Sequence, residues 1–179
     1  IMKTLRGYKY RIYPTAEQEQ HLRQQIGNAR FLWNRLLGAN EKYYKESYKF
    51  LWYNEANTKI NELKKEYEFL KLSSSQSLQQ VAVHFDSALT AYCEKRSEFP
   101  VLKHRRLGGS FSVPQHFKIK KRSVFIPKSS ATLKGRWVRM VKHRPLQGAI
   151  KSMTVSLDVD QWFVSILCEV EEKDPKPST

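Results

Sequence analysis

The chain has 179 residues, of which 32 are Lys or Arg and 17 are Asp or Glu, so its formal charge is +15. This charge favours polyanionic partners, and since no apolar run approaches the length of a membrane span, we expect neither a membrane helix nor a signal peptide. The two cysteines, Cys93 and Cys168, form no CxxC pair, which argues against a zinc site and a disulfide framework and is typical of a reducing cytoplasm.

The first element is a predicted strand over residues 5–13, where apolar and polar side chains alternate. Its inner face is expected to consist of Tyr8, Tyr10 and Ile12. Pro14 ends the strand, and Thr15 with Gln18 matches the capping box that begins many helices. We expect the helix that follows to stop at Gly38.

Three further helices are predicted before residue 99. The first two cover about 40–49 and about 54–67, and the third begins at the serines of 73–75. The buried face of the third is expected to comprise Leu78, Val81, Phe85, Ala88, Leu89 and Tyr92. Residues 15–96 therefore form a helical block.

From Phe99 onward the periodicity changes from helical to alternating. Strands are predicted at 110–119, 123–127, 136–141, 151–157 and 162–170. The last two form a hairpin around residues 158–161. The class is therefore α+β: a β-barrel with an inserted helical bundle, in which the first strand returns to join the later ones.

The basic residues are concentrated in one folded segment. Residues 99–157 contain 14 Lys or Arg and no acid, interleaved with apolar side chains, which indicates a surface for phosphates rather than a disordered tail. The expected phosphate contacts in this segment are Lys103, Arg105, Arg106, Lys118, Lys120, Lys121, Arg122, Arg136, Arg139, Lys142 and Arg144. Outside it we expect Lys9, Arg11 and Arg30 to contribute.

The sequence shows no pattern of catalytic carboxylates. The one close pair, Asp158 and Asp160, lies at a predicted turn, where Asp is common for local reasons. Trp52, Tyr53 and Trp137 have the chemistry to stack on bases, although the core is the usual place for any one aromatic. Ser75, Gln76 and Gln79 share a polar helix face that is equally compatible with base recognition and with plain solvation.

Several segments carry a resemblance to a known family. They are Tyr10–Pro14 with Gln18, Ala29–Asn34, Leu78–Ala88, the segment from Phe99 and Pro100 to Ile126 and Pro127, and the close of the hairpin at Leu167–Val170. In this order they resemble the TnpB (OrfB) proteins of bacterial insertion sequences, and the resemblance covers nearly the whole chain.

The resemblance implies an RNA-guided DNA endonuclease. By it, residues 1–14 are the first strand of a wedge (OB-like) barrel, 15–98 a helical recognition lobe, 99–170 the remainder of the barrel, and 171–179 a linker toward a RuvC-type nuclease domain. The family's catalytic acids, its Mg²⁺ and its structural Zn²⁺ belong to that nuclease half. We therefore expect no catalytic residue, metal or cofactor in this chain.

The implied partners are a guide RNA, double-stranded target DNA and the remainder of the same polypeptide, in a bacterial cytoplasm. The positions that match the family's readers of the motif flanking the target are Tyr53, Asn57, Ser75, Gln76, Gln79 and Gln115. Two alternatives remain: a stand-alone or nuclease-dead DNA-binding regulator that uses the helix at 15–37 directly, and a structural RNA-binding protein.

Overall fold

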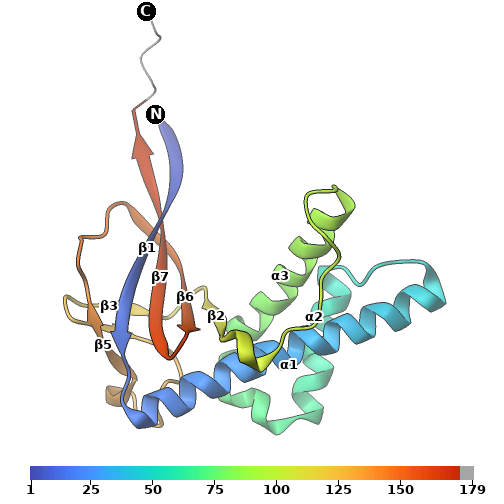
Figure 1. The fold of residues 1–179 in the computed structure, drawn as a ribbon, viewed down its shortest axis with the longest axis horizontal. Coiled ribbons are helices and arrows are strands. Elements are labelled where there is room, and N and C mark those ends of the chain that lie inside the picture. Colours follow the sequence, from blue (N-terminus) through green and yellow to red (C-terminus); the bar gives the residue numbers. More distant parts are fainter. Residues whose placement is uncertain (174–179) are drawn as a thin grey trace, which may run out of the picture.

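The computed structural model describes residues 1–173, which form one antiparallel sheet and a group of helices (Figure 1). The strands are β1 (Met2–Tyr13), β2 (Gly109–Val113), β3 (Lys118–Ile119), β4 (Ser123–Phe125), β5 (Trp137–Val141), β6 (Ala149–Asp158) and β7 (Gln161–Glu172). The α-helices are α1 (Ala16–Ser47), α2 (Tyr53–Glu66) and α3 (Ser75–Cys93). Short 3₁₀ turns are η1 (Glu68–Leu72), η2 (Arg105–Leu107) and η3 (Lys134–Arg136).

The sheet has the strand order β2-β6-β7-β1-β5-β4-β3. The first strand does return to the later ones: β1 pairs with β7 from Met2 to Ile12 and with β5 from Arg11 to Tyr13. The α+β class is therefore confirmed. Because β2 and β3 remain the two edges among the described residues, the curled sheet is a half-barrel, whereas the sequence predicted a β-barrel.

Alternation explains how the strands face. On β1 the predicted inner residues Tyr8, Tyr10 and Ile12 are all buried. The hairpin of β6 and β7 closes on Val159 and Asp160, which both have positive φ, 43° and 64°. That pair of conformations matches the twist of the flanking strands, so a two-residue turn suffices.

Two strand boundaries differ from the prediction. The strand expected at 110–119 is two strands, because Pro114 lacks an N–H for the ladder and His116 adopts φ 66°. At the other end β7 continues to Glu172, paired with Met2, so residues 171 and 172 are strand rather than linker. Residues 174–179 of the predicted linker lie outside the described residues.

Helix α1 begins as predicted and ends later. The capping box is present: Thr15 Oγ1 accepts from the Gln18 N–H at 3.2 Å, and Gln18 Oε1 accepts from the Thr15 N–H at 2.9 Å. The predicted stop at Gly38 is wrong, because one glycine costs a helix only about 1 kcal/mol and packing outweighs it. Beyond it, buried Asn40 accepts a hydrogen bond from the Leu51 N–H at 2.7 Å.

The long α1 runs from the sheet to the other helices (Figure 1) and joins two hydrophobic cores. Its first half packs Leu22 and Ile26 against the sheet, and its second half packs Leu32 and Leu36 against α2 and α3. On α3 the predicted inner face is confirmed for Leu78, Val81, Phe85 and Leu89; Ala88 is partly buried. Tyr92 is 41% exposed, contrary to the prediction, because it lies at the last turn of the helix.

Within the part of the chain that the structure describes, none of the helices has the length and hydropathy to span a bilayer.

Candidate nucleic-acid interface

The predicted base-reading residues gather where α2 meets the start of α3. The Tyr53 N–H donates to Asp86 Oδ1 at 2.9 Å, which fixes the first turn of α2 against α3. From there the Tyr53 hydroxyl accepts a hydrogen bond from Gln79 Nε2. Lys64 Nζ donates to Ser75 Oγ at 3.2 Å, and Asn57 lies one helical turn after Tyr53. We call Tyr53, Asn57, Ser75, Gln76 and Gln79 the polar cluster.

The loop between β2 and β3 reaches this cluster from the sheet. His116 Nε2 lies 3.2 Å from Gln76 Nε2, and the neighbouring Gln115 is exposed. The contacts thus place Tyr53, Ser75, Gln76 and Gln79 around the start of α3. Asn57 lies one turn along α2 and Gln115 beside His116. Sequence reasoning missed Lys64 and His116; for His116, adjacency to Gln115 was the available signal.

Lys128 also joins the sheet to the helical part at this point. Its Nζ donates to the carbonyl of Lys71 at 2.7 Å and to that of Ser73 at 3.1 Å, just before α3 begins. Burial lowers the pKa of Lys128, and the nearby charges of Arg136 and Lys64 lower it further. Lys128 therefore holds the chain leading into α3, a role that the basic sequence pattern did not reveal.

The outward side of the sheet carries alternating cations and rings. Lys9, Arg11 and Tyr13 point away from the core on β1, opposite Phe163 on β7 and Arg139 on β5. Lys9 Nζ lies 4.3 Å from the Phe163 ring centre, while Arg11 Cζ and Arg139 Cζ lie 4.9 and 5.2 Å from that of Tyr13. We call these five residues the outer sheet face.

Arg11 in this face has unused hydrogen-bonding capacity. Its Nε is buried and has no hydrogen-bond partner among the described residues. Leaving a buried guanidinium N–H without a partner is costly. Cations separated by aromatic rings on an extended surface suit a nucleic-acid strand, since the cations neutralise phosphates and the rings accept bases.

A second cationic site lies between α1 and the turn η2. Arg23, Arg30 and Arg105 line a pocket of about 270 Å³ there, together with Gln20 and Gln24. Burial lowers the pKa of Arg30, and the charge of Arg105 lowers it further. Two guanidinium groups held close together favour an anion between them. Arg106, the next residue of η2, is exposed.

Three predicted phosphate contacts also make contacts within the fold. Lys103 Nζ lies 4.1 Å from the Trp33 ring centre, and burial lowers the pKa of Lys103. Arg136 Nε donates to the Ser130 carbonyl at 3.0 Å. Arg144 packs over Tyr8 at 4.7 Å and donates to the Gly7 carbonyl at 3.3 Å.

The remaining predicted cations lie on or near the β3–β5 part of the sheet. Lys118 lies in β3, and Lys120 is the residue that follows this strand. Lys121 and Arg122 are exposed in the turn before β4, and Lys142 follows β5. The predicted phosphate contacts therefore occupy several surfaces rather than one.

The described residues place no three His, Cys, Asp or Glu side chains together as metal ligands would be. Asp158 is the last residue of β6 and Asp160 lies in the β6–β7 turn, so the pair is at a turn, as the sequence predicted.

Known proteins match this chain along its whole length. The model of the OrfB helix-turn-helix domain matches residues 2–49. A protein of Escherichia coli (strain K12) named "Putative RNA-guided DNA endonuclease InsQ" is 31% identical over 178 residues, 97% of this chain and 43% of its own length. A protein of Streptomyces pristinaespiralis named "Putative RNA-guided DNA endonuclease" is 30% identical over 186 residues, which cover all of this chain and 45% of its own length. The chain thus spans less than half the length of these relatives.

The region that matches the helix-turn-helix domain does not contain two helices joined by a turn. Residues 2–49 contain strand β1 and a single continuous helix, α1, whose N-terminal half packs against the sheet. No second helix follows a turn within them, so this region offers no helix pair of the kind that enters a DNA groove.

Proposed function

We propose that this chain, which belongs to the TnpB/OrfB family, holds a guide RNA on its curled sheet and recognises the duplex flanking a DNA target with its polar cluster. The observation that carries the proposal is that two chemically different surfaces lie on one chain. One is cationic and aromatic, and the other is made of uncharged hydrogen-bonding side chains with flanking lysines.

The chemistry of each surface supports its assignment. The outer sheet face and the Arg30–Arg105 pocket present fixed cations that bind phosphates regardless of sequence. The polar cluster presents amides and hydroxyls, and a glutamine amide pairs with adenine through one donor and one acceptor. In RNA-guided recognition the protein contacts only the short flanking motif, while base pairing supplies the remaining specificity.

The names of the two relatives support a shared task. Both are designated RNA-guided DNA endonucleases, and both are about twice as long as this chain. In our proposal the sheet is the wedge, residues 15–98 are the recognition lobe, and cleavage depends on the part of the relatives that this chain does not span. The chain would then bind both RNA and DNA, in the bacterial cytoplasm.

The test is to purify the chain from its host and sequence the RNA that accompanies it. We expect one dominant RNA species, and we expect much less of it when Lys9, Arg11 and Arg139 are replaced by Ala. RNA recovery no higher than from the triple variant would contradict the proposal. Motif-specific DNA binding by the RNA-free chain would favour the stand-alone DNA-binding regulator instead.

A further inference from the structure

An aromatic pocket lies beside the outer sheet face, on the strands β3, β4 and β5. Lys118 on β3, Phe125 on β4 and Trp137 on β5 are direct neighbours across the three strands. Alternation explains the arrangement, because Val124 and Val138 fill the core and leave the residues beside them on the opposite side. Phe125 and Trp137 meet edge to face, with their ring centres 5.5 Å apart.

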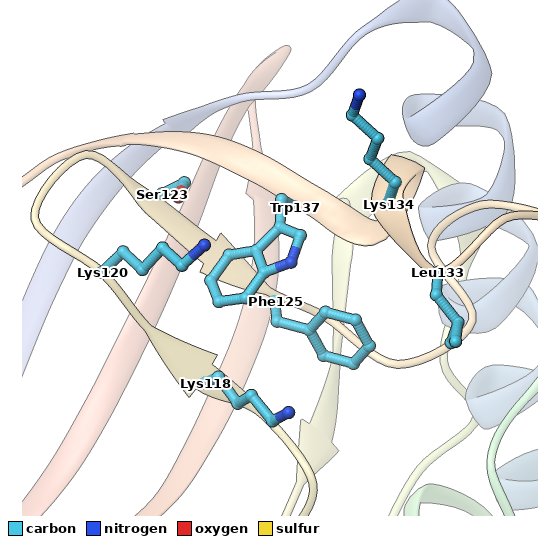
Figure 2. A pocket seen from close by; sticks show the side chains of 7 residues that line it. All are labelled: Lys118, Lys120, Ser123, Phe125, Leu133, Lys134 and Trp137. Atoms are coloured by element: carbon cyan, nitrogen blue, oxygen red, sulfur yellow. The ribbon is translucent and has the colours of Figure 1, made fainter.

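The two rings form the floor of a pocket of about 590 Å³ (Figure 2). Figure 2 shows Lys118 and Lys120 on one side of the rings and Lys134 with Leu133, from the η3 segment, on the other. No lining residue is acidic. The volume falls within the range of small-ligand sites and accommodates one nucleobase with its sugar.

We propose that this aromatic pocket binds an unpaired nucleobase, with the lysines holding the phosphates on either side of it. An apolar small molecule would leave three surrounding ammonium groups unused, and a base-paired duplex would have no free base face to offer. An unpaired base satisfies both features, because every base has a face that stacks on a ring and is linked to phosphates at both sides. This inference rests on the proposed function, since it assumes a nucleic-acid partner.

Lys120 lies over one of the two rings. Its Nζ is 4.1 Å from the centre of the Trp137 ring. An exposed contact between an ammonium group and a ring is weaker than the stacking of a base. The base therefore displaces Lys120 from the ring, and the freed ammonium group moves to a neighbouring phosphate. Lys118 Nζ lies farther from its ring, 5.8 Å from the centre of Phe125, and also moves to a phosphate when a base binds.

The test measures fluorescence anisotropy of the full chain with four labelled probes. They are a short oligoadenylate RNA, the same sequence as DNA, a sugar–phosphate chain of equal length without bases, and an RNA duplex. For Trp137→Leu we expect about tenfold weaker binding of whichever single strand, RNA or DNA, the wild-type chain binds more tightly. Binding of the base-free chain and of the duplex should change little. Trp137→Phe, which keeps a ring, should weaken binding much less. Lys134→Gln should weaken all four probes about equally.

The probes also separate the two sources of an unpaired base. Tighter binding of the RNA supports a base of the guide, and tighter binding of the DNA supports a base of a displaced DNA strand. Equal weakening by Trp137→Leu on the base-free chain and on the single strand would overturn the base site. If no probe binds the wild-type chain at all, the proposed function itself fails, which is a distinguishable result.

A second measurement uses the unaltered chain, so it does not depend on whether a variant folds. RNA that contains 4-thiouridine is cross-linked to the wild-type protein, and the attached peptides are identified by mass spectrometry. We expect cross-links at Phe125 or Trp137. Cross-links confined to other aromatic residues would overturn the assignment.

Discussion

Replacing Gln79 by Ala should remove sequence recognition while leaving the fold intact. The Gln79 amide donates one N–H to the Tyr53 hydroxyl, which leaves its second N–H and its carbonyl oxygen for a base. These are the two groups that a bidentate contact to adenine requires, and such a contact contributes ~1–3 kcal/mol of discrimination. We therefore expect binding of the preferred flanking motif to weaken by about 5- to 150-fold.

The effect on stability should be small by comparison. Gln79 is exposed, and substitutions of exposed side chains usually change the free energy of unfolding by no more than about 0.5 kcal/mol. Gln147→Ala is the matched control, because Gln147 is also exposed and also hydrogen-bonded to a side chain, that of Arg6 at 3.3 Å. It should leave motif binding unchanged.

Tyr53→Phe probes the same hydrogen bond from the other side. The ring remains, but the amide of Gln79 no longer has the partner that orients it, so motif binding should weaken by ~0.5–1.5 kcal/mol, less than for Gln79→Ala. Because Tyr53 acts through Gln79, the double variant should bind the motif no more weakly than Gln79→Ala alone.

The assay compares dissociation constants for two duplexes in the presence of the co-purified RNA. One carries the flanking motif selected from a randomised library, and the other carries a scrambled flank. Equal weakening of both duplexes by Gln79→Ala would refute the assignment of the reader residues, because the polar cluster would then be a solvated helix surface.

Four further outcomes are expected. Replacing Lys9, Arg11 and Arg139 by Ala should make RNA binding less sensitive to salt. The slope of log affinity against log salt, measured by anisotropy at several salt concentrations, should fall by about 1 for each phosphate that is no longer neutralised. An unchanged slope would place the interface elsewhere. Asn28→Ala should lower the free energy of unfolding by ~1–3 kcal/mol in chemical denaturation, because buried Asn28 Nδ2 donates to Ser73 Oγ at 2.9 Å and to the Phe69 carbonyl at 3.1 Å. Iodoacetamide should label exposed Cys93 readily, whereas Cys168 should react only at higher pH or after unfolding, because burial raises the pKa of its thiol and only the thiolate attacks. The purified chain should not cut target DNA with Mg²⁺ and RNA present, because our proposal assigns cleavage to the part of the relatives that this chain does not span; guide-dependent cutting would contradict this.

Local patterns predicted the parts of the fold that local physics determines. The capping box at Thr15, the alternation around Tyr10 and the turn at residues 158–161 each depend on neighbours in sequence, and each is confirmed. Gly38 shows where this fails: the residue weakens a helix, but tertiary packing outweighs that cost, and the hydrogen bond between Asn40 and Leu51 is one contact that the local pattern does not show.

The candidate sites divide in the same way. That residues 99–157 lack acids was visible in the sequence, and it predicted cationic surfaces. That Trp137 lies beside Phe125, and Arg11 beside Phe163, depends on strand register between distant segments, which no local pattern encodes. For the same reason the sequence did not show that Lys103 and Arg144 would be held against rings of the fold.

The most direct test of two separate surfaces compares two variants of the chain in two binding assays. One variant has Lys9, Arg11 and Arg139 replaced by Ala, and the other is Gln79→Ala. RNA affinity and the preference for the selected flank over the scrambled flank are measured for both. We predict that the first variant binds RNA more weakly and keeps its flank preference in whatever complex still forms, while Gln79→Ala keeps RNA affinity and no longer prefers the selected flank. If each variant impaired both properties to the same extent, the two surfaces would not have separate roles.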